Sequence, residues 1–120
     1  MTHPEADLQI QVADVLRLHE KARHFIWFSV PNELMGAARS RAGHARMARF
    51  KRMGLRSGIS DITIARNGLA YFLELKINGN GQSENQKQFE ADALRAGAEY
   101  KVVYSFDEAI DWLQYWGIIP

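Results

Sequence analysis

The spacing of apolar and polar residues predicts an alternation of helices and strands along the chain. Apolar side chains recur at helical spacing over residues 7–21, which predicts an amphipathic helix. A short run of β-forming residues at 25–30 predicts a strand. Residues 59–65 and 70–77 alternate as strands do, and Asn67-Gly68 between them is the strongest short signal for a hairpin closed by a type I′ turn.

The C-terminal third predicts a helix, a strand and a second helix. Residues 83–86 (SENQ) have the form of a capping box and open a helix that Gly97 ends. Residues 100–104 predict the strand, and a second capping box at 105–108 (SFDE) opens the last helix. The order αβ(α)ββαβα predicts an α/β fold, in which one domain covering residues 1–120 has a small mixed β-sheet flanked by helices.

Positive charge is concentrated in one segment, although the formal net charge of the chain is only +1. No acidic residue lies between Leu34 and Ser60. The segment is expected to be partly helical, interrupted by Gly43 and closed by Gly54. A polyanionic partner such as DNA and a solvated helix face both explain such a segment. Its seven basic residues are Arg39, Arg41, Arg46, Arg49, Lys51, Arg52 and Arg56.

Composition excludes several classes of protein. The 47% hydrophobic and 24% charged residues are typical of a globular domain, and the absence of cysteine excludes disulfide bonds and thiolate zinc sites. No segment is apolar enough to span a membrane, and the N-terminal residues do not resemble a secretory signal, so we expect a cytoplasmic protein. The histidines have no ligand spacing and are not expected to bind metal: His3, His19, His24 and His44.

The predicted hairpin brings two carboxylates together. With a two-residue turn, Asp61 falls directly opposite Glu74, with Cβ atoms roughly 4.5–5.5 Å apart, and like charges in this position destabilise a sheet. Lys76 shares their face of the hairpin, so one interpretation is an exposed ion pair. The other is a bound divalent cation such as Mg²⁺, which prefers carboxylate and other oxygen ligands. Lys76 would then orient or deprotonate a water, or stabilise charge on a phosphate.

One stretch of the sequence resembles the metal-binding signature of the PD-(D/E)XK nuclease superfamily. It consists of Asp61, twelve further residues and then Glu74-Leu75-Lys76, and it has Ser60 in place of the usual proline. Further motifs resemble one branch, the VRR-NUC (virus-type replication-repair nuclease) domains. They follow the expected order over nearly the whole chain: residues 5–9 (EADLQ), 30–33 (VPNE), 51–54 (KRMG) and 83–86 (SENQ). The resemblance implies a restriction-endonuclease-like core and a small stand-alone protein encoded by a bacterium or a phage.

The same resemblance implies a role for each residue of the signature. Asp61 and Glu74 would bind Mg²⁺ or Mn²⁺ together with the backbone carbonyl of Leu75, and Lys76 would be the catalytic lysine. Glu5 matches a glutamate of the first helix that leans toward the metal in this family. The alternative for Glu5 is an acid that interacts favourably with the helix dipole.

Several polar residues keep two interpretations. Asp7 would take the place of Glu5 near the metal if the family motif aligns with the first helix in a shifted register. Gln86 either caps its helix or belongs to the active site, and one side chain is not expected to do both. Gln9 either supports the site from behind the ligands or has no role in it. Asn32 contacts phosphate or forms a turn. The aromatic residues near the C-terminus are expected in the core or at a subunit contact: Trp112, Tyr115 and Trp116.

The resulting prediction is a metal-dependent DNA endonuclease. The metal would polarise the scissile phosphate and activate water, while the basic segment and Asn32 would contact the DNA backbone. In the resembled family, small members are structure-directed, which implies branched DNA such as four-way (Holliday) junctions, a role in DNA repair and a homodimer. The alternatives are a non-catalytic DNA-binding module and a structural or regulatory phage protein built on the same fold.

Overall fold

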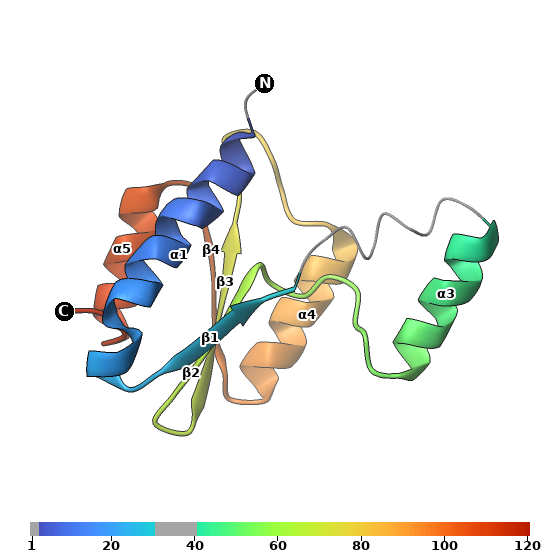
Figure 1. Cartoon of the computed structure of the whole chain (residues 1–120). Helices are drawn as coiled ribbons and strands as arrows, with labels where there is room; N and C mark the ends of the chain where they lie inside the picture. The colour runs from blue at the N-terminus through green and yellow to red at the C-terminus, as the bar shows by residue number, and fades with distance from the viewer. Residues whose placement is uncertain (1–2, 31–40) are drawn as a thin grey trace.

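One four-stranded sheet carries helices on both faces (Figure 1). The structure is a computed structural model and describes residues 3–30 and 41–120. The order of helices and strands is the predicted one, so the α/β fold class is confirmed. The elements are α1 (Pro4–Arg23), β1 (Ile26–Ser29), α3 (Arg41–Arg52), β2 (Ile62–Arg66), β3 (Leu69–Leu75), α4 (Glu84–Arg95), β4 (Glu99–Val103) and α5 (Phe106–Tyr115).

The sheet is mixed, with the strand order β1-β2-β3-β4. β1 pairs with β2 and β2 with β3 in antiparallel fashion, whereas β3 and β4 are parallel. Parallel neighbours need a crossover connection, and α4 supplies it. In Figure 1, α1 and α5 cover one face of the sheet, α4 lies on the other, and α3 stands apart from the sheet.

The hairpin between β2 and β3 has the predicted turn and register. Asn67 and Gly68 have positive φ angles of 53° and 79°, as a type I′ turn requires. Ile62 lies opposite Leu73, and the pairing continues to the turn without a bulge. β2 begins three residues later than predicted, so Asp61 lies just before the ladder rather than within it.

The apolar face of the hairpin forms the main core, as predicted. It packs against Leu8, Val12 and Leu16 of α1 and against α5. Trp116 joins this core, whereas Trp112 is partly buried and Tyr115 is 80% exposed, so the core prediction for these aromatics is confirmed only in part. The hairpin residues buried in this core are Ile62, Ile64, Tyr71, Leu73 and Leu75.

The opposite face of β3 is also covered, which the sequence did not indicate. Phe72 of β3 and Tyr100 of β4 pack against Phe89 and Ala93 of α4 in a second apolar cluster. Glu74 lies on this face with only 2% of its surface exposed. The interpretation of Glu74 as part of an exposed ion pair is therefore wrong.

Two local predictions also need correction. α3 runs through Gly43 without interruption, because one glycine costs only about 1 kcal/mol in a helix rich in good helix formers. At the second capping box, the Ser105 hydroxyl accepts a hydrogen bond from the Glu108 N–H, but the Glu108 carboxylate binds the N–H of Tyr104 instead of Ser105. Within residues 3–30 and 41–120, no helix combines the length and apolar character needed to cross a bilayer.

Candidate functional site

Asp61 is tied to the end of the hairpin by a hydrogen bond from the backbone. Its Oδ2 accepts a 2.7 Å bond from the N–H of Leu75. Its carboxylate also lies close enough to Glu74 to raise the pKa of that carboxyl group. The structure therefore brings the two predicted metal ligands together, and both are held by backbone that the sheet makes rigid.

The environment of Glu74 makes its ionisation unfavourable. Burial raises the pKa of Glu74 from 4.5 to about 9, and the hydrogen bond and negative charge of Asp61 contribute to the rise. The charge of Glu5 adds to the increase, whereas the charge of Lys76 opposes it. At neutral pH, and with no cation bound, the Glu74 carboxyl group is therefore protonated.

Gln86 takes both of the roles that were expected to exclude each other. Its Oε1 accepts a 2.9 Å hydrogen bond from the N–H of Ser83, which completes the capping box. Its Nε2 donates a 3.1 Å hydrogen bond to Oε2 of Glu74. A carboxamide has an acceptor and donors at different ends, so the cap of α4 orients the amide toward the buried carboxyl group.

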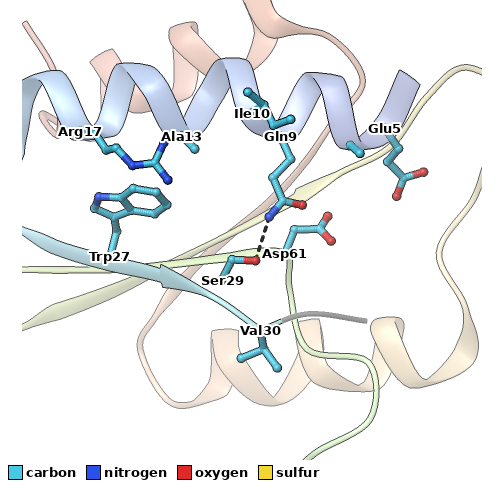
Figure 2. Close-up of a pocket in the computed structure, with 10 residues that line it drawn as sticks. Glu5, Gln9, Ile10, Ala13, Arg17, Trp27, Ser29, Val30 and Asp61 are labelled. Atoms are coloured by element: carbon cyan, nitrogen blue, oxygen red, sulfur yellow. Dashed lines mark hydrogen bonds between the residues drawn. The ribbon is translucent and has the colours of Figure 1, made fainter. Parts of the chain in front are cut away.

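Glu5 and Gln9 project from α1 toward the end of the sheet (Figure 2). With Asp61 and part of β1 they line a cavity of about 480 Å³, which we call the α1–β1 cleft. Gln9 donates a 2.8 Å hydrogen bond to the hydroxyl of Ser29, so its contact is with β1. Within residues 3–30 and 41–120, no three Asp, Glu, His or Cys side chains form a metal-binding group, so Glu5 shares the cleft with Asp61 without completing a carboxylate cluster.

The predicted DNA-binding residues that the structure describes are exposed, and one of them also forms an ion pair. Arg56 forms an ion pair with Asp92, and its guanidinium lies 5.2 Å from the ring centre of Phe89, so it holds the segment after α3 against α4. The Arg56 bond also lowers the pKa of Asp92. Asn32 and Arg39 lie outside the described residues. The exposed basic side chains of α3 are Arg41, Arg46, Arg49, Lys51 and Arg52.

The fold of the chain is similar to that of solved structures. One structure, described as "VRR_NUC domain", superposes with a TM-score of 0.62 at 17% identity, over 96% of this chain and 99% of that chain. A second, described as "VRR_NUC domain protein", gives 0.65 at 20% identity, over 96% and 88%. The fold is that of a VRR-NUC domain. No protein-family model and no curated protein matches the sequence.

Ser60 lies directly before Asp61, where the PD-(D/E)XK signature that the sequence resembles usually has a proline. It is only 3% exposed, and its hydroxyl donates a 3.0 Å hydrogen bond to the carbonyl of Ile62. This bond joins the residues on either side of Asp61 and so restrains the backbone at Asp61. A proline at position 60 would restrain the backbone in a different way, through its fixed φ angle. The departure from the signature therefore leaves Asp61 in a defined position.

Gly58 is a site residue of this VRR-NUC fold that the sequence analysis missed. It has a φ angle of +80°, and a Cβ atom placed on it would lie 2.3 Å from the carbonyl carbon of Asn85 and 2.7 Å from the backbone nitrogen of Gln86. The loop before Asp61 thus touches the first turn of α4 directly. Asn85 lies 27 residues further along the chain, so no local pattern indicates this contact. The presence of a glycine at position 58 was its only sign in the sequence.

We expect Glu74→Gln to stabilise the metal-free protein above about pH 5. The pKa of Glu74 is raised on folding from 4.5 to about 9, so stability is greatest below 4.5 and falls as the pH rises to about 9. Because glutamine does not ionise, the gain reaches at most about 3 kcal/mol at pH 7. The measurement is urea unfolding in EDTA from pH 4 to 9.

Glu84→Gln is the matched control for this measurement, because it removes the same charge from a side chain that is 92% exposed. It should change stability little at any pH. A gain from Glu74→Gln that does not vary with pH would contradict the assignment of a raised pKa to Glu74.

Proposed function

We propose that this protein is a metal-dependent DNA endonuclease that hydrolyses phosphodiester bonds. The observation that carries the proposal is the position of Asp61 beside the buried Glu74 at the end of the hairpin. Two carboxylates side by side are unfavourable in an empty sheet, and a divalent cation removes that cost by offsetting their negative charge. The VRR-NUC fold of the chain supports the same activity.

The donor groups at this point suit a hard divalent cation. The carboxylates of Asp61 and Glu74 and the backbone carbonyl of Leu75 would hold Mg²⁺ or Mn²⁺, whose preferred ligands are oxygen atoms. The bound ion would supply Lewis-acid polarisation of the phosphate and a lower pKa for the attacking water. Gln86 would keep the Glu74 carboxylate oriented through its 3.1 Å hydrogen bond.

Lys76 would provide positive charge beside the scissile phosphate. It follows Glu74 by two residues, directly after β3, and its charge acts on Glu74 strongly enough to oppose the rise in the pKa of that carboxyl group. An ammonium group at this position would hold a water or stabilise negative charge as it develops on phosphate oxygen. Glu5, which faces the same cleft as Asp61, would stand on the side from which water approaches.

The wider parts of the proposal concern the substrate and the assembly. We propose branched DNA, with four-way junctions as the preferred form, and a homodimer that cuts both strands, in the service of DNA repair. β1 is an edge strand whose side chains Ile26 and Phe28 are 69% and 53% exposed, so it offers apolar surface for a subunit contact.

The test is a cleavage panel of duplex, single-stranded, flap and four-way junction DNA with Mg²⁺, Mn²⁺ or EDTA. We expect metal-dependent cleavage that favours branched substrates, and no cleavage in EDTA. Equal nicking of all substrates would contradict the proposed preference for branched DNA, but it would still support the proposed nuclease activity. Salt-dependent DNA binding without cleavage in either metal would favour the non-catalytic DNA-binding module.

We expect the double variant Lys51→Ala/Arg52→Ala to bind DNA more weakly without changing its preference among DNA structures. The binding constant falls as salt concentration rises, and each lost phosphate contact makes the slope of log K against log salt concentration shallower by about 0.9. The slope of the double variant should therefore be shallower by about 1.8. Fluorescence anisotropy at several salt concentrations measures this slope. The matched control is Lys87→Ala/Arg95→Ala on α4, whose cations already pair with Glu84 and Asp92 and should leave the slope unchanged.

A further inference from the structure

The α1–β1 cleft extends well beyond the carboxylates at its end (Figure 2). Glu5 and Asp61 mark one end, and Arg17 and Trp27 mark the other. The polar groups of Gln9 and Ser29 are already bonded to each other at 2.8 Å. The rest of the lining is apolar and consists of Ala6, Ile10, Ala13 and Val30. Metal binding and phosphate hydrolysis do not require this apolar space.

The far end of the cleft is a preformed stacking surface. The guanidinium of Arg17 lies 5.2 Å from the centre of the Trp27 ring. The indole is fixed in turn, because its Nε1 donates a 2.7 Å hydrogen bond to Glu20 and the ring packs against the main core. Arg17 remains 62% exposed, and its ion pair with Asp14 is a long one of 3.3 Å at the surface. The face of the guanidinium away from the indole is therefore available to a ligand.

The stacking surface and Asp61 line the same cleft. Trp27 and Ser29 are two residues apart on β1, so they lie on one face of the strand about 7 Å apart. Ser29 lies opposite Ile62, the residue that follows Asp61. A group stacked on Arg17 would therefore belong to a nucleotide close to the phosphate being cut.

Shape and charge in the cleft suit one nucleotide. A cavity of about 480 Å³ has the size of a small-molecule site, and a base would cover its apolar middle. Proteins stack unpaired bases on aromatic side chains and on guanidinium planes, and the Trp27–Arg17 pair presents both. A cation bound between the carboxylates would offset the negative charge that Glu5 and Asp61 bring to the other end.

We propose that the α1–β1 cleft receives one unpaired nucleotide of the strand being cut, whose base stacks on the guanidinium that Arg17 holds over Trp27. This inference rests on the proposed nuclease function. A base within continuous duplex is held by stacking and pairing, so it enters the cleft only after extrusion, which costs a few kcal/mol. An already unpaired nucleotide avoids that cost, and the cleft therefore selects branched or bulged DNA over duplex.

The first test compares Arg17→Ala with Lys21→Ala on two DNAs, a continuous duplex and the same duplex with a single unpaired nucleotide. Lys21 is the matched control because it removes an equal charge from the same helix, one turn outside the cleft. We expect the ratio of cleavage rates, bulged over continuous, to fall about tenfold in Arg17→Ala, in line with the stacking contribution of one base. The Lys21→Ala ratio should stay at the wild-type value. Equal ratios in the two variants would overturn the proposal.

The second test does not depend on cleavage. In the variant Trp112→Phe/Trp116→Phe, Trp27 is the remaining tryptophan. Circular dichroism confirms that this variant is folded before use. Bulged DNA added with Ca²⁺ should quench Trp27 fluorescence, and continuous duplex at the same degree of saturation should not. Equal quenching by both DNAs, or none by either, would overturn the cleft proposal, whereas quenching without cleavage in Mg²⁺ or Mn²⁺ would contradict only the nuclease.

Discussion

The variant Asp61→Asn is expected to lose about a thousandfold in DNA cleavage while it keeps DNA binding and fold, since removing one preorganised electrostatic group at a reacting centre costs up to this amount. Asparagine retains an oxygen that accepts the 2.7 Å hydrogen bond from the Leu75 N–H, so the end of the hairpin stays in place. What it removes is the negative charge that a divalent cation would need beside Glu74. Single-turnover cleavage in Mg²⁺, with binding measured in Ca²⁺, separates the two effects.

Asp111→Asn is a suitable control for this experiment, because Asp111 is an exposed carboxylate on α5, a helix that lies on the opposite face of the sheet from α4. It should cleave like the wild type. If Asp61→Asn also cleaves at the wild-type rate with Mg²⁺, the metal does not bind at the carboxylate pair and the proposed mechanism is wrong.

Gly58→Ala is the second variant for which we expect a large effect, on both stability and activity. An added Cβ atom would approach the Asn85 carbonyl carbon to 2.3 Å, which forces the backbone of the loop or of α4 to move. Displacement of the first turn of α4 moves Gln86 away from Glu74. Misplacement of about 1 Å near a reacting centre costs about a hundredfold in rate, and we expect a stability loss of about 2–4 kcal/mol.

Gly79→Ala separates close packing from backbone strain. Gly79 has a φ angle of +88°, close to the +80° of Gly58, but a Cβ atom placed on it meets no other atom within 4 Å. It carries the same conformational penalty and should cost stability without the hundredfold loss of cleavage. If thermal unfolding and single-turnover cleavage change equally in the two variants, the contact between Gly58 and α4 has no special role in the site.

Local patterns in the sequence were sufficient for the order of strands and helices and for the hairpin register that brings Asp61 close to Glu74. The hairpin register depends on the Asn67-Gly68 turn and on side-chain alternation, and both act over a few neighbouring residues. The capping box at Ser83 likewise places the start of α4. Such features are predictable because the interacting groups are close together in the sequence.

Some features of the site depend on contacts between distant segments. Alternation places Glu74 on the polar face of the hairpin, yet α4 covers that face through Phe89 and Ala93, so the alternative of an exposed ion pair is wrong. Arg56, one of the predicted DNA-binding residues, forms an ion pair with Asp92 of α4, and its DNA contact stays a prediction. In both cases the partner lies in a helix whose docking position no local pattern describes.

The amino-acid pattern alone predicts the order of elements, the type I′ turn and the register of β2 against β3. It also predicts Asp61, Glu74 and Lys76 as candidate site residues. These features follow from backbone preferences and from periodicities of two and 3.6 residues. The burial of Glu74, the bond from Gln86, the close approach of Gly58 to α4 and the cleft between α1 and β1 require the folded chain. Desolvation and packing depend on which elements meet in space, so the raised pKa of Glu74 is a property of the assembled fold.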